Sequence, residues 1–332
     1  MTKDISLLLR LMALTILPLT SACTEDEGMT DDADSSSQRI TFTIGDENHW
    51  TETTRTRGTQ ATTASLSAGF GVSAAVYPAA GTYASYGCGS YFHNVRALPA
   101  TATKYFWPTG DYRMAFYAYY PYGDSALTLQ SAANATGVPT YAYTVPQTVA
   151  SQLDVMTAQV TDRSCVSPSA VALSFAHRCA DIRFTVTNEQ ASTLRVKNIS
   201  VYGVKYSGTL TGSSWTLTGS ANSSSSHPFT LTSNTDIAAS ATADITGTAN
   251  HFIMLPQTVA AATDIFVITT IENSEEKTYT YTLPSAMTWQ AGKSYTYAIT
   301  ISTGGITVSG VTIVDWSLLA NTSIIAKAWK NT

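Results

Sequence analysis

The chain has 332 residues, a formal net charge of −5 and only 12% charged residues. It contains no basic cluster that could follow a phosphate backbone, which argues against nucleic acid as a partner. Thr, Ser, Ala and Tyr are abundant and few segments have the period of an amphipathic helix, so the composition favours an all-β protein.

The chain begins with a short apolar leader that ends at Cys23. Basic residues outnumber acidic ones before the apolar run, and the run is too short to cross a bilayer core of ~30 Å. We therefore expect residues 1–22 to be an export signal. A Cys directly after Ser21-Ala22 resembles the lipobox of bacterial lipoproteins, in which this thiol is acylated, although Thr20 departs from the pattern. The alternative is a secreted protein with an unmodified Cys.

The segment 23–38 is acidic, with no basic residue and little apolar surface. Its acidic side chains are Glu25, Asp26, Glu27, Asp31, Asp32 and Asp34. Such a stretch cannot bury enough surface to offset its ordering entropy, which predicts a solvated tether. It resembles the acidic signal that sends some lipoproteins of gut and oral Gram-negative anaerobes to the outer face of the outer membrane. The alternative is a charged linker with no address.

Period-two alternation of Thr with apolar residues predicts many short strands. The opening run at residues 40–44, a run at 180–186 and another at 295–301 show the pattern most clearly. Hydroxyl groups facing water and apolar groups facing inward suit half-buried antiparallel strands. These runs predict antiparallel β-sandwiches.

A short internal sequence repeat suggests two related domains. Residues 141–150 and 251–260 both end in Pro-Gln-Thr-Val-Ala, and each is followed by an Asp that opens a new apolar run. Proline ends a strand because it cannot donate to the ladder, so each copy predicts strand, turn and strand. A chance match is the alternative. The predicted domains are residues 39–167 and 168–303, with a C-terminal extension at 304–332.

Aromatic residues crowd the segment 105–122. An exposed platform would let Trp107, Tyr117 and Tyr119 stack on sugars. The alternative is a strand at 112–120 whose rings pack into a sandwich core, which is the commoner role of such strands. Both interpretations stay open on sequence alone.

The sequence offers little for catalysis or for metal binding. It contains no His-x-x-x-His, Cys-x-x-Cys or Gly-x-Ser-x-Gly pattern, so we expect no enzyme, no metal and no cofactor. Besides Cys23, the cysteines are Cys88, Cys165 and Cys179. A bridge between Cys165 and Cys179 is possible, but the odd number favours buried free thiols.

In order along the chain, these motifs resemble the fimbrillins and fimbrillin-like lipoproteins, which build the donor-strand (type V) pilus. The segments that carry the resemblance are Cys23, residues 40–44, Thr53-Thr54-Arg55-Thr56-Arg57-Gly58, Tyr105-Phe106-Trp107-Pro108, residues 112–121, 153–158 and 171–177, Leu255-Pro256-Gln257, and residues 289–297. The resemblance implies two transthyretin-like β-sandwiches in tandem behind the signal peptide and the tether.

The resemblance also implies a maturation step. In polymerising members an Arg-specific protease removes the N-terminal segment with its first strand, which opens a groove for a strand of the next subunit. Here Arg55 or Arg57 would be cut, releasing Cys23 together with the strand that carries Ile40, Phe42 and Ile44. The alternative is an uncut loop, as in accessory members.

The C-terminal extension supplies two strand-like runs that suit a donor strand. Their apolar residues are Val308, Val311 and Ile313 in the first run and Ile324, Ile325 and Trp329 in the second. Either run could instead fold back as an edge strand of its own domain.

The expected function is structural. We expect a surface lipoprotein of the outer membrane, anchored through Cys23, that serves as a shaft, tip or accessory subunit of an adhesive pilus and binds other subunits by strand addition. The alternative is a surface lipoprotein that does not polymerise and binds host or dietary glycans through its aromatic residues.

Overall fold

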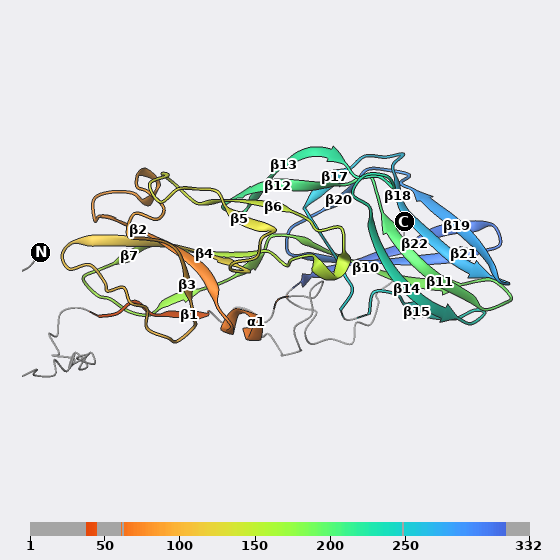
Figure 1. The fold of residues 1–332 in the computed structure, drawn as a ribbon, viewed down its shortest axis with the longest axis horizontal. Helices are drawn as coiled ribbons and strands as arrows, with labels where there is room; N and C mark the ends of the chain where they lie inside the picture. The colour runs from red at the N-terminus through yellow and green to blue at the C-terminus, as the bar shows by residue number, and fades with distance from the viewer. Residues whose placement is uncertain (1–37, 45–60, 62, 248, 317–332) are drawn as a thin grey trace, which may run out of the picture. The chain divides into compact units, whose positions relative to one another are not determined.

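The computed structural model describes residues 38–44, 61, 63–247 and 249–316, which belong to one compact unit (Figure 1). Almost all regular structure in these residues is β, which confirms the all-β prediction. The described helices are short: α1 (Thr63–Ser67) and the 3-10 turns η1 (Tyr83–Ser85) and η2 (Val149–Ser151).

The first large sheet is antiparallel and has the strand order β3-β2-β4-β7-β9. Its strands are β3 (Phe92–Ala97), β2 (Phe70–Pro78), β4 (Tyr112–Tyr120), β7 (Met156–Ser164) and β9 (Ala176–His177). In Figure 1, β2, β4 and β7 run side by side in this sheet. A separate parallel pair joins β1 (Phe42–Ile44) to β8 (Val171–Leu173).

A second sheet, of order β13-β12-β6-β5, combines segments that are distant in sequence. Its strands are β5 (Leu127–Leu129), β6 (Thr140–Thr144), β12 (Lys205–Thr211) and β13 (Ser214–Ala221). The sheet thus joins strands from both sides of the expected boundary at residue 167. The domain limits themselves remain a prediction.

The remaining strands form two larger sheets and one small pair. Strands β14 (Phe229–Ile237), β11 (Leu194–Val201), β18 (Asp264–Glu272) and β19 (Glu275–Thr282) form one sheet in that order. Strands β15 (Thr242–Asp244), β10 (Ala180–Asn188), β21 (Lys293–Ser302) and β22 (Gly305–Asp315) form the other, with β16 (Phe252–Met254) also on β10. Strands β17 (Gln257–Val259) and β20 (Met287–Trp289) pair separately. The pairing of β10 with β21 is parallel, unlike that of their neighbours.

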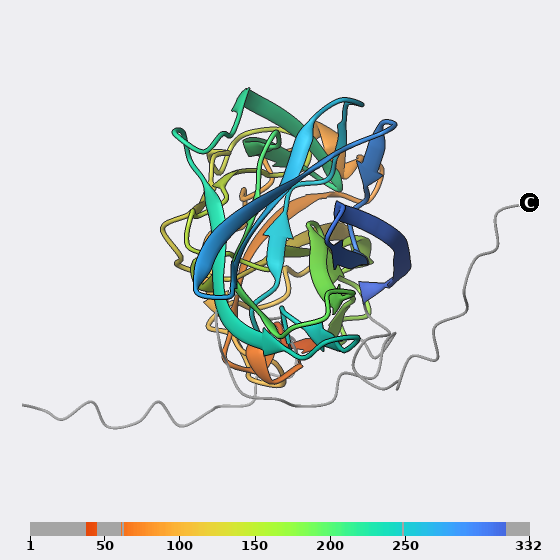
Figure 2. The ribbon, with the colours of Figure 1, turned by 90° about the vertical axis from the view of Figure 1, so that its right-hand side faces the viewer.

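Alternation explains why β10 is a core strand. Ile182, Phe184 and Val186 follow one another at every second position and are fully buried, because successive strand side chains point to opposite faces. Strand β22 lies at the end of this sheet, and among the described strands it pairs with β21 alone. Figure 2 shows this dark blue strand at the margin of the ribbon.

In the part of the chain that the structure describes, buried apolar side chains gather in three clusters. One cluster surrounds Phe42, Phe70 and Phe116, and a larger one surrounds Phe184 and Phe266. A small third cluster lies on the opposite face of β2 and β4. The sheet that contains β2 and β4 is therefore covered on both faces.

Gly71 on β2 is a position where a side chain cannot fit. A Cβ there would lie 2.1 Å from Cε1 of Tyr119, whose buried ring covers the glycine across the strand pair. We expect Gly71→Ala to lower the free energy of unfolding by about 1–3 kcal/mol through overpacking, measured by urea denaturation. Gly310→Ala is the control, because a Cβ at Gly310 has open space, and it should change stability by less than ~0.5 kcal/mol. Equal stability of the two variants would contradict the prediction.

Candidate functional site

The first described segment, residues 38–44, forms a strand held from both sides. On one side β1 pairs in parallel with β8, so that Phe42 lies opposite Val171 and Ile44 opposite Leu173. These pairs join residues that are far apart in the sequence. The strand therefore pairs with a part of the chain that is synthesised much later than the strand itself.

On its other side, the same segment bonds to the connection that precedes β4. The amide of Ile40 donates to the carbonyl of Tyr105, and the amide of Thr103 donates to the carbonyl of Ile40, both at 2.9 Å. The amide of Trp107 donates to the carbonyl of Gln38, also at 2.9 Å. Hydrogen bonds on both sides make this segment an inserted strand rather than a loose edge.

The side chains of the inserted strand fill the core beneath it. Ile40 and Phe42 are fully buried. The ring of Phe42 lies edge-on to Phe70 at a centroid distance of 6.0 Å and to Phe116 at 5.6 Å. Without this strand, the backbone groups that pair with it on either side and the apolar side chains beneath it would be exposed. The segment therefore occupies a strand-shaped groove.

Several residues singled out in the sequence lie outside the described residues. They are Cys23, Arg55, Arg57, Ile324, Ile325 and Trp329. Lipidation, cleavage and strand donation at these positions remain predictions.

The first C-terminal run, with Val308, Val311 and Ile313, forms β22. It pairs antiparallel with β21 along its length, so in this chain it is an edge strand of its own sheet. Val308 packs against the larger core, whereas Val311 and Ile313 are 43% and 57% exposed. The apolar residues of this run therefore lie on two faces.

The aromatic segment packs inward. Trp107, Tyr117 and Tyr119 are all less than 5% exposed, and β4 spans Tyr112–Tyr120 as the core alternative expected. The hydroxyl of Tyr119 donates to Oδ1 of Asn94 at 2.6 Å. These three rings are therefore buried, and the interpretation of them as an exposed platform is wrong.

Two buried carboxylates lie close to histidines. Asp154 accepts from the amide of Ala61 at 2.7 Å and lies 2.8 Å from Nδ1 of His177. The ring of His177 stacks on Trp316, with centroids 4.5 Å apart. The pair ties the region before β7 to the residue that follows β22.

Asp181 is the second buried carboxylate. Its Oδ2 accepts from Nε of Arg183 at 2.6 Å and from the hydroxyl of Ser294 at 2.7 Å. Its Oδ1 lies 3.1 Å from Nδ1 of His251, in an electrostatic contact whose angles are poor for a hydrogen bond. Burial disfavours the charged form, but His251, Arg183 and Ser294 together outweigh it and hold the pKa of Asp181 well below its usual range.

Among the described residues, Cys88, Cys165 and Cys179 are buried free thiols, and Cys165 does not pair with Cys179. No group of His, Cys, Asp and Glu side chains in the described ranges could hold a metal ion. None of the helices that the structure describes is long and apolar enough to span a membrane.

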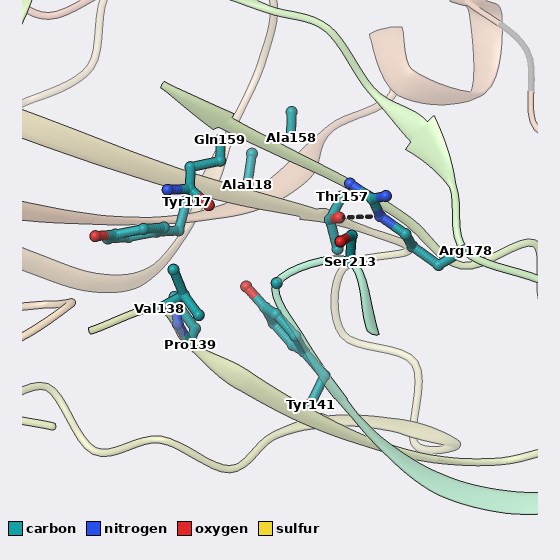
Figure 3. A pocket seen from close by; sticks show the side chains of 11 residues that line it. Tyr117, Ala118, Val138, Pro139, Tyr141, Thr157, Ala158, Gln159, Arg178 and Ser213 are labelled. Atoms are coloured by element: carbon teal, nitrogen blue, oxygen red, sulfur yellow. Dashed lines mark hydrogen bonds between the residues drawn. The ribbon is translucent and has the colours of Figure 1, made fainter. Parts of the chain in front are cut away.

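A pocket of about 200 Å³ lies where the first sheet meets the second (Figure 3). Tyr117 of β4 and Thr157 of β7 line it from one side, and Tyr141 of β6 from the other. Arg178 follows β9 at one end, where its Nε donates to Oγ1 of Thr157 at 2.6 Å. Sequence reasoning missed this site, because its side chains come from separate strands and match no local motif.

Solved structures of low sequence identity share this fold. A fimbrial protein from Bacteroides vulgatus is 18% identical with a TM-score of 0.62, and the match covers 84% of this chain and 99% of that one. A candidate cell adhesion protein from Bacteroides uniformis is 22% identical with a TM-score of 0.51, over 85% of this chain and 99% of the other. Comparison with curated protein sequences gave no significant match.

The sequence model of the fimbrillin-like family matches residues 54–316. The match therefore begins before β2 and ends at Trp316, and it spans most of the chain. Together with the shared fold, it identifies a structural protein of the fimbrial type rather than an enzyme. The chain belongs to the fimbrillin-like family.

Proposed function

We propose that this protein is a surface-exposed, lipid-anchored subunit of an adhesive pilus, acting in the shaft, at the tip or as an accessory component. Other subunits join it by strand exchange at the groove that residues 38–44 occupy. The family and the fold support the fimbrial role. The inserted strand is the observation that carries the assembly step.

The inserted strand is suited to replacement. It bonds on both sides to main-chain groups, which any strand can match, and its side chains Ile40 and Phe42 fill the core at every second position. A strand with apolar residues at the same spacing could make equivalent contacts. Because an empty groove would expose unpaired backbone and apolar surface, subunits with an open groove are driven to capture a strand.

The arginines lie where a release site is needed. Arg55 and Arg57 follow the inserted strand and precede α1 in the chain. Cleavage after either residue would detach β1 from the rest of the protein. It would also detach Cys23, so that the lipid holds the precursor at the outer membrane and neighbouring subunits hold the mature form.

We assign the donated strand to the run with Ile324, Ile325 and Trp329. The preceding run, β22, is already paired with β21. Two of its apolar residues, Val311 and Ile313, face away from the sheet's core. The last run is apolar except for Lys327 and follows β22 in the chain, which suits it to reach a neighbour.

Treatment of the purified full-length precursor with an Arg-specific protease tests this proposal. We expect a single early cut after Arg55 or Arg57, read by N-terminal sequencing, and a ladder of detergent-resistant oligomers on unboiled gels. The double variant Arg55→Ala/Arg57→Ala should stay uncut and monomeric. A variant truncated before Ile324 should be cut but should not form a ladder.

The opposing result is equally clear. Cut protein that has lost residues 38–44 yet remains monomeric at high concentration would overturn strand exchange. A ladder in the uncut double variant would show that assembly does not need release of the first strand.

A further inference from the structure

The pocket beside Arg178 has features that strand exchange does not explain. It is formed by strands β4 and β7 on one side and by β6 and the Gly212-Ser213 turn on the other. The turn is tight, with Gly212 at a φ of +60°, which a glycine adopts at little cost. The pocket is well separated in the chain from the inserted strand.

Arg178 is a half-buried cation that has no counter-ion in the described part of the chain. Its one side-chain hydrogen bond goes to the neutral hydroxyl of Thr157, and no residue that lines the pocket is acidic. Among the described residues it forms no ion pair. Burial lowers the pKa of Arg178, as expected for a cation withdrawn from water without compensation. A bound anion would supply the missing charge.

Two buried tyrosines line the pocket, and in the described part of the chain neither hydroxyl has a hydrogen-bond acceptor; Figure 3 shows that of Tyr117 at the end away from Arg178. Tyr117 is 3% exposed and its hydroxyl has no partner. Tyr141 is 4% exposed, its hydroxyl forms no hydrogen bond among the described residues, and Figure 3 shows that hydroxyl directed toward Tyr117. Burial raises the pKa of both phenols, so both keep their protons and remain donors. Unpaired buried donors are costly unless a ligand accepts from them.

We propose that this pocket binds an acidic sugar, a single hexuronic acid ring, with its carboxylate on Arg178. A planar guanidinium pairs with a planar carboxylate through two parallel hydrogen bonds. The hydroxyls of the ring meet the neutral polar groups of Tyr141, Gln159 and Ser213 around the mouth. Ala118 and Val138 supply apolar contact for the ring's C–H groups.

The size and the polarity of the pocket select this class of ligand. About 200 Å³ is below the roughly 300–1,000 Å³ of pockets for drug-sized ligands, which suits one sugar ring. One cation favours a monoanion over a phosphate dianion. The surrounding neutral hydrogen-bonding groups favour a ligand with several hydroxyls over an acidic peptide side chain, which has none.

Calorimetric titration of the full-length protein with methyl glucuronide tests the proposal. Methyl glucoside is the matched ligand, because it differs only in carrying a neutral hydroxymethyl group where the glucuronide has its carboxylate. We expect saturable one-to-one binding of the glucuronide, weakened at least about tenfold in Arg178→Gln and about threefold in Tyr141→Phe. Arg113→Gln removes an exposed cation of β4 that does not line the pocket and should bind normally.

Thermal melting of each variant confirms that it is folded. Binding of the glucoside as strong as that of the glucuronide would overturn the proposal, as would unchanged affinity in folded Arg178→Gln. Absence of saturable binding, or equal binding of an Asp-rich peptide, would also overturn it. These outcomes are independent of cleavage and polymerisation, so this proposal and the strand-exchange proposal fail separately.

Discussion

We expect Phe42→Ala to lower the free energy of unfolding of the uncut protein by about 3–5 kcal/mol. The ring is fully buried and contacts Phe70 and Phe116, so its removal leaves a cavity in the core cluster that surrounds these two rings. Urea denaturation of the full-length chain measures the loss. Thr43→Ala, on the exposed face of the same strand, is the matched control and should cost less than ~0.5 kcal/mol.

The same pair of variants also reports on the inserted strand. In protein cut after Arg55 or Arg57 and freed of the first strand, Phe42→Ala should have no effect on stability, because the residue is gone. A difference of less than ~1 kcal/mol between the two uncut variants would contradict the packing of β1 described above.

Asp181→Ala should cost about 3–5 kcal/mol at pH 7, because it leaves the cation of Arg183 and the hydroxyl of Ser294 without their buried acceptor. Asp236→Ala is the control. Asp236 pairs with Arg195 on the surface, where water replaces a lost partner, so we expect little change. Equal stability of the two variants would show that the buried network contributes nothing.

The pH dependence gives a second readout of Asp181. Its pKa is lower in the folded protein than in the unfolded chain, so its contribution is complete above the ordinary carboxyl pKa of about 4. The contribution is lost as pH falls below that value. The wild-type protein should therefore lose stability in acid more steeply than Asp181→Ala. Part of the slope remains in the variant, because bonds from Lys277, Tyr279 and Thr270 outweigh burial and lower the pKa of Glu272 to about 2.

Alternation was a sound guide to individual strands. The aromatic run predicted at 112–120 coincides with β4, and the runs at 180–186 and 295–301 lie within β10 and β21. In β10 and β21 the apolar residues recur at every second position and face a core, so the period of two is visible in the residue types, whereas β4 is buried on both faces. Parallel pairing of β10 with β21 could not be predicted, because alternation does not encode the direction of a neighbour.

Burial at the second face of β10 could not be predicted from the sequence either. Asp181 and Arg183 stand between the apolar residues of β10 and read as a solvent face, yet Asp181 is fully buried. Their opposite charges at a spacing of two were the available signal, since such residues share a face and can pair. The internal sequence repeat did not predict equivalent surroundings for its two Asp residues. Asp154 is buried against His177, whereas its counterpart Asp264 is exposed and bonds to Thr282.

The two candidate sites differ in how far they could be predicted from the sequence. The inserted strand was visible as an apolar alternation at residues 40–44. The pocket was not, because Arg178, Tyr117 and Tyr141 are separated along the chain and converge only when two sheets meet. An arginine near a histidine, or a tyrosine in a strand, has no distinctive sequence context.

The parallel pairing of β1 with β8 also sets an order for folding. During synthesis β1 must wait until roughly 130 further residues have been made before its partner β8 exists. Closing so long a loop carries an entropic cost, so β1 should dock after the neighbouring hairpins have formed. We therefore expect folding to pass through a nearly complete protein whose groove is still vacant. Proteolytic removal of β1 would return the subunit to the state with a vacant groove, which it occupied during folding before β1 docked.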